Sequence, residues 1–198
     1  MSISQQARSI VGSISSMIDP HLPLEIQHDI KLLWHPENLR AVLHGRPFDA
    51  RPITMELDPT LDCNYACAFC TYGAWEKRTQ TLAGLRYMGR EEMEIILHRV
   101  AEGGVKGLIF TGGGEPFQNP HTPFGLEMAM HLGIQTGIFT NGSLLAPDMT
   151  DRVLAAAPQF LRISANAVTP PIYTRLHGLK DERIAQAVWE NIRSTASR

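Results

Sequence analysis

The chain has 198 residues, of which 43% are hydrophobic and 19% charged, a composition that predicts a globular protein with a buried core. The net charge is −2 without any basic run, so binding to nucleic acid through its phosphates is not expected. No apolar stretch approaches the length of a membrane span, and no secretory signal is visible. The cysteines are three in number and clustered, which is not a disulfide framework and indicates a reducing, cytoplasmic compartment.

Residues 1–50 are expected to form an N-terminal helical extension. Apolar residues at helical spacing predict helices over 3–18 and 24–34, and a shorter helix over 37–44. The alternative for 3–18 is an amphipathic membrane anchor, but its polar face lacks the Lys and Arg residues typical of such anchors.

Residues 51–198 are expected to form a second domain in which strands alternate with helices. Short apolar runs predict strands over 53–57, 105–110, 134–139 and 160–163. Helical spacing predicts helices over 90–102, 123–132, 147–157, 172–177 and 181–195. This β–α alternation predicts an α/β fold with a parallel sheet covered by helices.

All the cysteines of the chain lie in one loop, which follows the first expected strand with the spacing C-x3-C-x2-C: Cys63, Cys67 and Cys70. One short loop can turn three thiolates toward a common soft metal centre. An iron–sulfur cube normally takes four cysteines, so three would leave one iron free to react. A Cys3His zinc site is an alternative, although zinc ligands usually come as two pairs and the nearest histidines along the chain are His44 and His98. Three unrelated buried cysteines are the other alternative.

Three further loops follow the ends of the other expected strands: Gly112–Pro116, Thr140–Gly142 and Ser164–Asn166. Carboxyl ends of parallel strands meet at one edge, where binding sites are built, so the loops are expected to share a ligand. The glycine run lacks the pattern of a phosphate-binding loop. A tight turn is its alternative reading, and a plain Asn-Gly turn is that of Asn141-Gly142.

The cysteine loop, with Phe69 before its third cysteine, resembles the signature of the radical S-adenosylmethionine (radical SAM) superfamily. The resemblance extends over about residues 53–178 and implies that the three cysteines are catalytic and hold a [4Fe–4S] cluster whose free iron binds S-adenosylmethionine (SAM). It also implies cofactor-binding roles for Phe69, Gly113, Gly114, Glu115, Thr140, Asn141, Arg162, Ser164 and Asn166. Within this set, Gly113–Glu115 would bind the SAM amino group, and an inward-facing Arg162 would bind a carboxylate.

The resemblance further implies a partial (β/α) TIM-like barrel and reductive cleavage of SAM to a 5′-deoxyadenosyl radical, which takes a hydrogen atom from a substrate. With about four βα units visible, the chain is expected to be truncated at its C-terminus. A small molecule or natural-product intermediate is the expected substrate, and flavodoxin or ferredoxin the expected reductant. The alternatives are a macromolecular substrate, in a peptide maturase, a glycyl-radical activase or a tRNA modifier, and a zinc- or cluster-stabilised binding module without turnover.

Overall fold

The computed structural model describes residues 35–71 and 87–198, and the chain divides into two compact units, Met1–Pro52 and Ile53–Arg198. In the first unit it shows helix α3 (Pro36–Leu43) and the 3-10 turn η2 (Pro47–Asp49). The side chain of Asn38, in α3, binds the backbone of Arg51, which follows η2. Its Nδ2 donates to the Arg51 carbonyl and its Oδ1 accepts from the Arg51 amide. The helix expected over 37–44 is therefore confirmed, while those expected over 3–18 and 24–34 lie outside the described residues.

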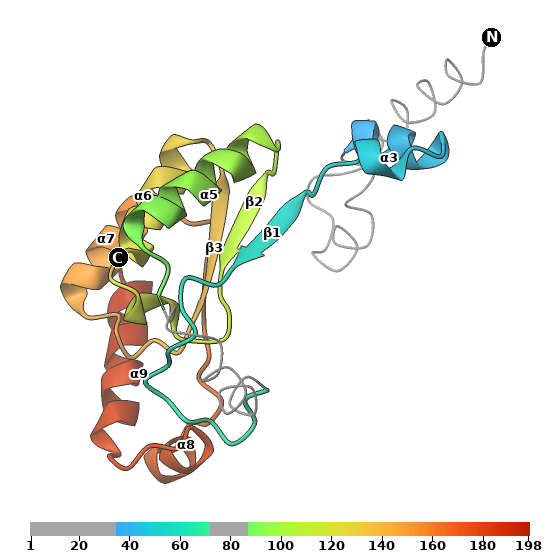
Figure 1. Cartoon of the computed structure of the whole chain (residues 1–198). Coiled ribbons are helices and arrows are strands. Elements are labelled where there is room, and N and C mark those ends of the chain that lie inside the picture. Colours follow the sequence, from blue (N-terminus) through green and yellow to red (C-terminus); the bar gives the residue numbers. More distant parts are fainter. Residues whose placement is uncertain (1–34, 72–86) are drawn as a thin grey trace. The chain divides into compact units, whose positions relative to one another are not determined.

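The second unit contains a parallel sheet in the order β1–β2–β3–β4, so the predicted α/β fold is confirmed (Figure 1). Its strands are β1 (Thr54–Leu57), β2 (Gly107–Phe110), β3 (Gln135–Thr140) and β4 (Phe160–Ile163). Each strand pairs in parallel with the next one along the chain. Their carboxyl ends consequently lie at one edge of the sheet.

The helices between and after these strands also follow the expected alternation. They are α5 (Arg90–Glu102), the 3-10 turn η3 (Pro116–Gln118), α6 (Thr122–His131), α7 (Pro147–Ala155), α8 (Pro170–Leu176) and α9 (Arg183–Ala196). Figure 1 shows α5, α6 and α7 on the same face of the sheet. None of the helices in the described part of the chain is long and apolar enough to cross a membrane.

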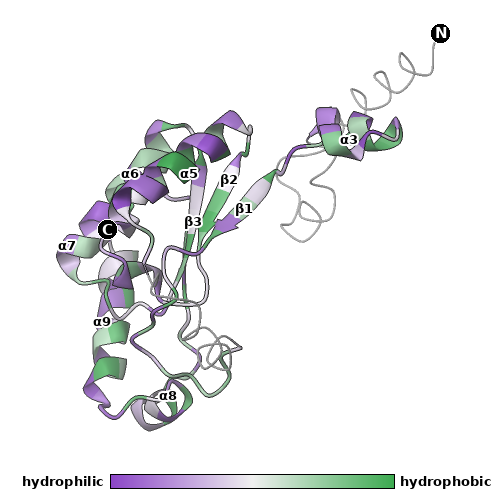
Figure 2. Ribbon diagram, in the orientation of Figure 1, coloured by the Kyte–Doolittle hydropathy of each residue, from purple (hydrophilic) through white to green (hydrophobic). Residues whose placement is uncertain are grey.

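The main core lies between the sheet and these helices. Leu108 and Phe110 alternate along β2 with less buried residues and pack in one cluster with Met93 and Leu97 of α5 and Leu126 of α6. Burying such large side chains stabilises the fold by about 2–3 kcal/mol each. Figure 2 shows hydrophobic residues along β2 and a mixture of hydrophilic and hydrophobic segments along α5, as expected for an amphipathic helix.

A second, smaller core positions the cysteine loop. Tyr65, from that loop, is buried together with Tyr173 of α8 and with Ala185 and Val188 of α9. The rings of Tyr65 and Tyr173 meet edge to face, 6.4 Å apart between centroids. The loop thus packs on the two helices that follow the last strand of the sheet.

Candidate metal and cofactor site

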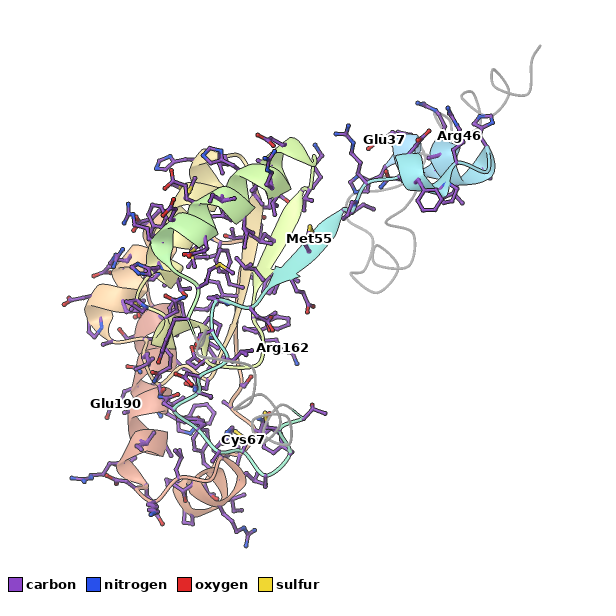
Figure 3. The ribbon with its side chains drawn as sticks, viewed as in Figure 1. Glu37, Arg46, Met55, Cys67, Arg162 and Glu190 are labelled. Carbon is purple, nitrogen blue, oxygen red and sulfur yellow. The ribbon has the colours of Figure 1, made fainter. Side chains whose placement is uncertain are left out.

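A cavity of about 360 Å³ lies at the carboxyl ends of the strands. The cysteine loop and the loops after β2, β3 and β4 all line it. The predicted site residues in its wall are Cys63, Cys67, Phe69, Cys70, Gly114, Glu115, Thr140, Asn141, Arg162, Ser164 and Asn166. Gly112 lines it in place of the predicted Gly113, whose amide lies 3.3 Å from Oδ2 of Asp58 and donates to it. Figure 3 shows Cys67 and Arg162 at the same end of the sheet.

The three cysteines are free thiols in the wall of this cavity. Burial, with a smaller contribution from negative charge on Cys63 and Cys70, raises the pKa of the Cys67 thiol to about 11. The pKa of Cys63 is raised as well, mainly by burial and in part by Glu115 and Cys70. Thiolates that oppose one another's ionisation in this way are stabilised by a positively charged metal centre.

The donor set fits an iron–sulfur cluster better than a single ion. A lone zinc ion with thiolates at about 2.3 Å would need the sulfurs to converge within about 4 Å of one another. Within residues 35–71 and 87–198, no group of three His, Cys, Asp or Glu side chains is arranged to hold a single metal ion. A cluster takes one thiolate per iron, so its ligands stand further apart around a larger group. Cys63, Cys67 and Cys70 all line one cavity of about 360 Å³, which offers a group of this kind three thiols.

Backbone hydrogen bonds hold the cysteine loop on two sides. The amides of Ala66 and Ala68 donate to the carbonyls of His177 and Leu176, at 3.1 and 3.0 Å. These carbonyls end α8 and would otherwise lack a partner within the helix. On the other side, the Glu115 amide donates to the carbonyl of Asp62 at 2.8 Å.

Gly114 is required by this close approach. A Cβ at Gly114 would lie 2.7 Å from the carbonyl carbon and 2.8 Å from the amide nitrogen of Asp62. Neither backbone atom can rotate out of the way as a flexible side chain could. The glycine run after β2 therefore lets two backbone segments lie against each other. This packing is a structural reason for glycine at position 114, in addition to the predicted role in ligand binding.

The carboxylate of Glu115 is buried and turned into the protein. Its Oε1 accepts from the Thr140 hydroxyl at 2.6 Å and from the Phe117 amide at 3.3 Å, and its Oε2 accepts from the Asn141 amide at 2.7 Å. Burial raises the pKa of this carboxyl, while the three donors act in the opposite direction. Glu115 thus joins the loops after β2 and β3, and its oxygens already have partners within the chain.

An amide network then connects the loop after β3 to the cysteine loop. Asn141 Nδ2 donates to Oδ1 of Asn64 at 2.8 Å, and Asn64 Nδ2 donates to the hydroxyl of Ser143 at 2.8 Å. Ser143 closes the network by donating both its hydroxyl and its amide to Oδ1 of Asn141. Asn141-Gly142 is therefore more than a plain turn, because Asn141 also binds the loop that carries the thiols.

At the end of β4, the cavity wall is cationic and polar. The Arg162 guanidinium lies 4.9 Å from the centroid of the Phe139 ring on the neighbouring strand, a distance suited to a cation–π contact. Ser164 and Asn166 follow at alternating positions and line the same cavity. Arg162 therefore faces the cavity, as the carboxylate-binding role predicted for an inward-facing Arg162 requires.

His177 also lines the cavity, although it was not among the residues predicted for the site. Its side chain is 1% exposed, and its Nδ1 lies 3.1 Å from Sγ of Cys67, 110 residues earlier in the chain. Burial lowers the pKa of the imidazole. The ring of Phe69, in the same loop, packs edge to face on His177 with 5.6 Å between centroids. A His-Gly pair directly after a short helix was the available signal, but nothing in the sequence connected it to the cysteines.

Comparison with known proteins identifies the family. The family model described as "Radical SAM superfamily" matches residues 57–194. SuiB of Streptococcus suis bound to S-adenosylmethionine is 20% identical, with a TM-score of 0.55 over 88% of this chain and 37% of SuiB. SuiB bound to the precursor peptide SuiA gives the same identity and TM-score over 88% and 38%. SuiB without a named ligand is 18% identical, with a TM-score of 0.55 over 94% and 41%.

The chain therefore spans about two fifths of the length of SuiB, and the likeness to SuiB shows a shared fold. The family match confirms the resemblance inferred from the sequence. The predicted cofactors, a [4Fe–4S] cluster and SAM, are those of the superfamily, and the donor set described above fits them.

Proposed function

This chain belongs to the radical SAM superfamily, and on that premise we propose that it cleaves SAM reductively and takes a hydrogen atom from a substrate. One observation carries the proposal: the three thiols and the loops after β2, β3 and β4 line the same cavity. We assign this activity to residues 51–198 and regard residues 1–50 as a helical extension.

The bound cluster and SAM supply one-electron cleavage of a carbon–sulfur bond and hydrogen-atom abstraction, and the protein binds, orients and shields them. Cys63, Cys67 and Cys70 would hold three of the four irons and leave the fourth for SAM. We assign the SAM ammonium group to the loop Gly113–Glu115. Because Thr140, Asn141 and Phe117 already donate to the Glu115 carboxylate, we assign the role of acceptor mainly to backbone carbonyls of this loop.

The other end of the cavity suits the remaining parts of SAM. Arg162 can bind the SAM carboxylate through its planar fork of donors. Ser164 and Asn166 offer hydroxyl and amide groups to the ribose or to the same carboxylate, and Thr140 and Asn141 shape the wall between them. The backbone at Phe69 is assigned to the adenine.

A small molecule or natural-product intermediate is the proposed substrate, with a cytoplasmic one-electron donor such as flavodoxin or ferredoxin as reductant. A peptide is the second candidate, because SuiB, which shares the fold, has been seen with the precursor peptide SuiA. Extracts from cells grown in deuterated medium, separated by size, distinguish the two. The fraction that transfers deuterium into 5′-deoxyadenosine contains the substrate.

Anaerobic reconstitution with iron and sulfide tests the proposed activity. We expect about four irons per chain, and release of 5′-deoxyadenosine and methionine from SAM when a reductant is added. Cys67→Ala should lose the cluster and the cleavage, whereas His131→Ala, at an exposed position at the end of α6, should keep both. A wild-type protein that holds zinc and releases no 5′-deoxyadenosine would support the binding module instead.

A further inference from the structure

His177 is held against Cys67 from two directions. Its carbonyl accepts from the Ala66 amide at 3.1 Å, next to Cys67 in the loop. Its ring is enclosed by Tyr173, Tyr65 and Phe69, with centroids 4.2, 5.4 and 5.6 Å away. Backbone and ring are thus fixed independently, and together they place Nδ1 3.1 Å from Sγ of Cys67.

We propose that His177 is a positioning residue for the cluster, and that its Nδ1–H donates a hydrogen bond to the Cys67 thiolate and raises the reduction potential of the cluster. This inference rests on the proposed function, since it concerns a cluster held by Cys67. It assigns a role to a residue outside the cysteine motif, in the segment that follows α8.

The chemistry of the sulfur determines the direction of this hydrogen bond. A cysteine bound to iron is a thiolate and has no proton to donate. A contact between Nδ1 and that sulfur is therefore favourable only when the nitrogen carries the hydrogen. The other ring nitrogen, Nε2, is buried without a partner among the described residues. Leaving an acceptor lone pair there costs less than burying an unpaired N–H, so both nitrogens favour the same tautomer.

The effect on the cluster follows from charge. Reduction adds one electron from the external donor to a cluster that already carries negative thiolates. A hydrogen bond withdraws charge from one thiolate and therefore stabilises the reduced form more than the oxidised form. Removing the donor should make the cluster harder to reduce, without removing a ligand.

Two substitutions separate hydrogen bonding from packing. His177→Phe keeps a ring among Tyr65, Phe69 and Tyr173 but has no N–H. His177→Asn loses the ring, and its side-chain amide can place an N–H near the position of Nδ1. Tyr173→Phe is the matched control, because it changes the same aromatic cluster and removes only a hydroxyl that lies 3.4 Å from the Tyr65 hydroxyl.

The readout is the midpoint potential of the reconstituted cluster, measured by a redox titration followed by EPR in the absence of SAM. For His177→Phe we expect the reduction equilibrium to shift about tenfold toward the oxidised form, which is about 59 mV for a one-electron couple. His177→Asn should recover most of this shift, and Tyr173→Phe should match the wild type. A wild-type potential in His177→Phe, or an equally low potential in both His177 variants, would overturn the proposal.

A measurement on the wild-type protein avoids dependence on how the variants fold. With 15N-labelled histidine, the reduced cluster should show a weak nitrogen coupling, as expected across a hydrogen bond. A strong coupling would make His177 an iron ligand, and the absence of coupling would remove the contact, so either result contradicts the proposal. If instead the wild type binds no cluster, the proposed function itself fails.

Discussion

Replacing Gly178 with alanine tests how the cysteine loop is held on α8. Gly178 follows the end of α8 with φ +64°, and a Cβ there would lie 2.8 Å from the carbonyl carbon of Ala66 and 3.0 Å from the Ala66 Cβ. Gly133 occupies the corresponding position after α6 with φ +72°, but a Cβ there would have nothing within 4 Å. The two glycines therefore share a left-handed conformation and differ in crowding.

The comparison isolates the clash with the cysteine loop. Alanine in a left-handed conformation costs roughly 1–2 kcal/mol at either position. Crowding against backbone that cannot rotate away adds about 1–3 kcal/mol at Gly178. The extra loss corresponds to a melting temperature lower by about 2–12 °C than that of Gly133→Ala.

Thermal unfolding of both variants without cluster, followed by iron analysis after reconstitution, provides the measurement. We expect Gly178→Ala to melt lower than Gly133→Ala and to bind less iron, because the loop must move away from His177. Equal melting temperatures and equal iron contents would show that the contact between α8 and the loop does not position the thiols.

Other predictions concern the buried carboxylate, the asparagine network and the thiols. Glu115→Gln should lower the free energy of unfolding by about 1–3 kcal/mol in urea titrations, because the NH2 group of the glutamine would face hydrogen-bond donors. Thr140→Val leaves two of the three donors to the Glu115 carboxylate and should lower the free energy of unfolding less. A larger loss in Thr140→Val than in Glu115→Gln would contradict this account. Asn141→Ala should cost about 1–3 kcal/mol in the same titration and reduce iron binding, since it removes the hydrogen bond from Asn141 to Asn64 of the cysteine loop and the acceptor of Ser143; an unchanged iron content would argue against that role. In the cluster-free protein, alkylation of Cys67 followed by mass spectrometry should keep rising with pH up to about 11, because burial and the neighbouring thiolates oppose its ionisation; a plateau at or below pH 9 would show that the thiol is not shielded. At pH 8, the exposed Cys70 should react before Cys67.

Local sequence patterns were sufficient to predict the sheet and the loops at its edge. The apolar run before Thr111 predicted β2 because a strand packed on helices needs Leu108 and Phe110 inside the core. Helix α5 was predicted over its observed range because Met93, Leu97 and Val100 repeat at helical spacing on its buried face. Both patterns involve only residues that are close to one another in the sequence, within a single strand or helix.

The internal contacts of the site could not be predicted in the same way. The pairing of His177 with Cys67 depends on how α8 docks, and no local pattern connects residues 110 positions apart. The burial of Glu115 was also not visible in the sequence, because a carboxylate after a glycine run suits a ligand as well as it suits Thr140 and Asn141. The sequence predicted which groups bind a ligand, and the fold shows that one of them, Glu115, already accepts hydrogen bonds from within the chain.

EPR of the reduced, reconstituted protein before and after addition of SAM tests the central claim most directly. If Cys63, Cys67 and Cys70 hold a [4Fe–4S] cluster with one iron free, SAM should change the cluster spectrum by binding that iron. SAM labelled with 15N in its amino group should then add a nitrogen coupling. A cluster spectrum that SAM leaves unchanged would contradict the claim that these loops form one cofactor site.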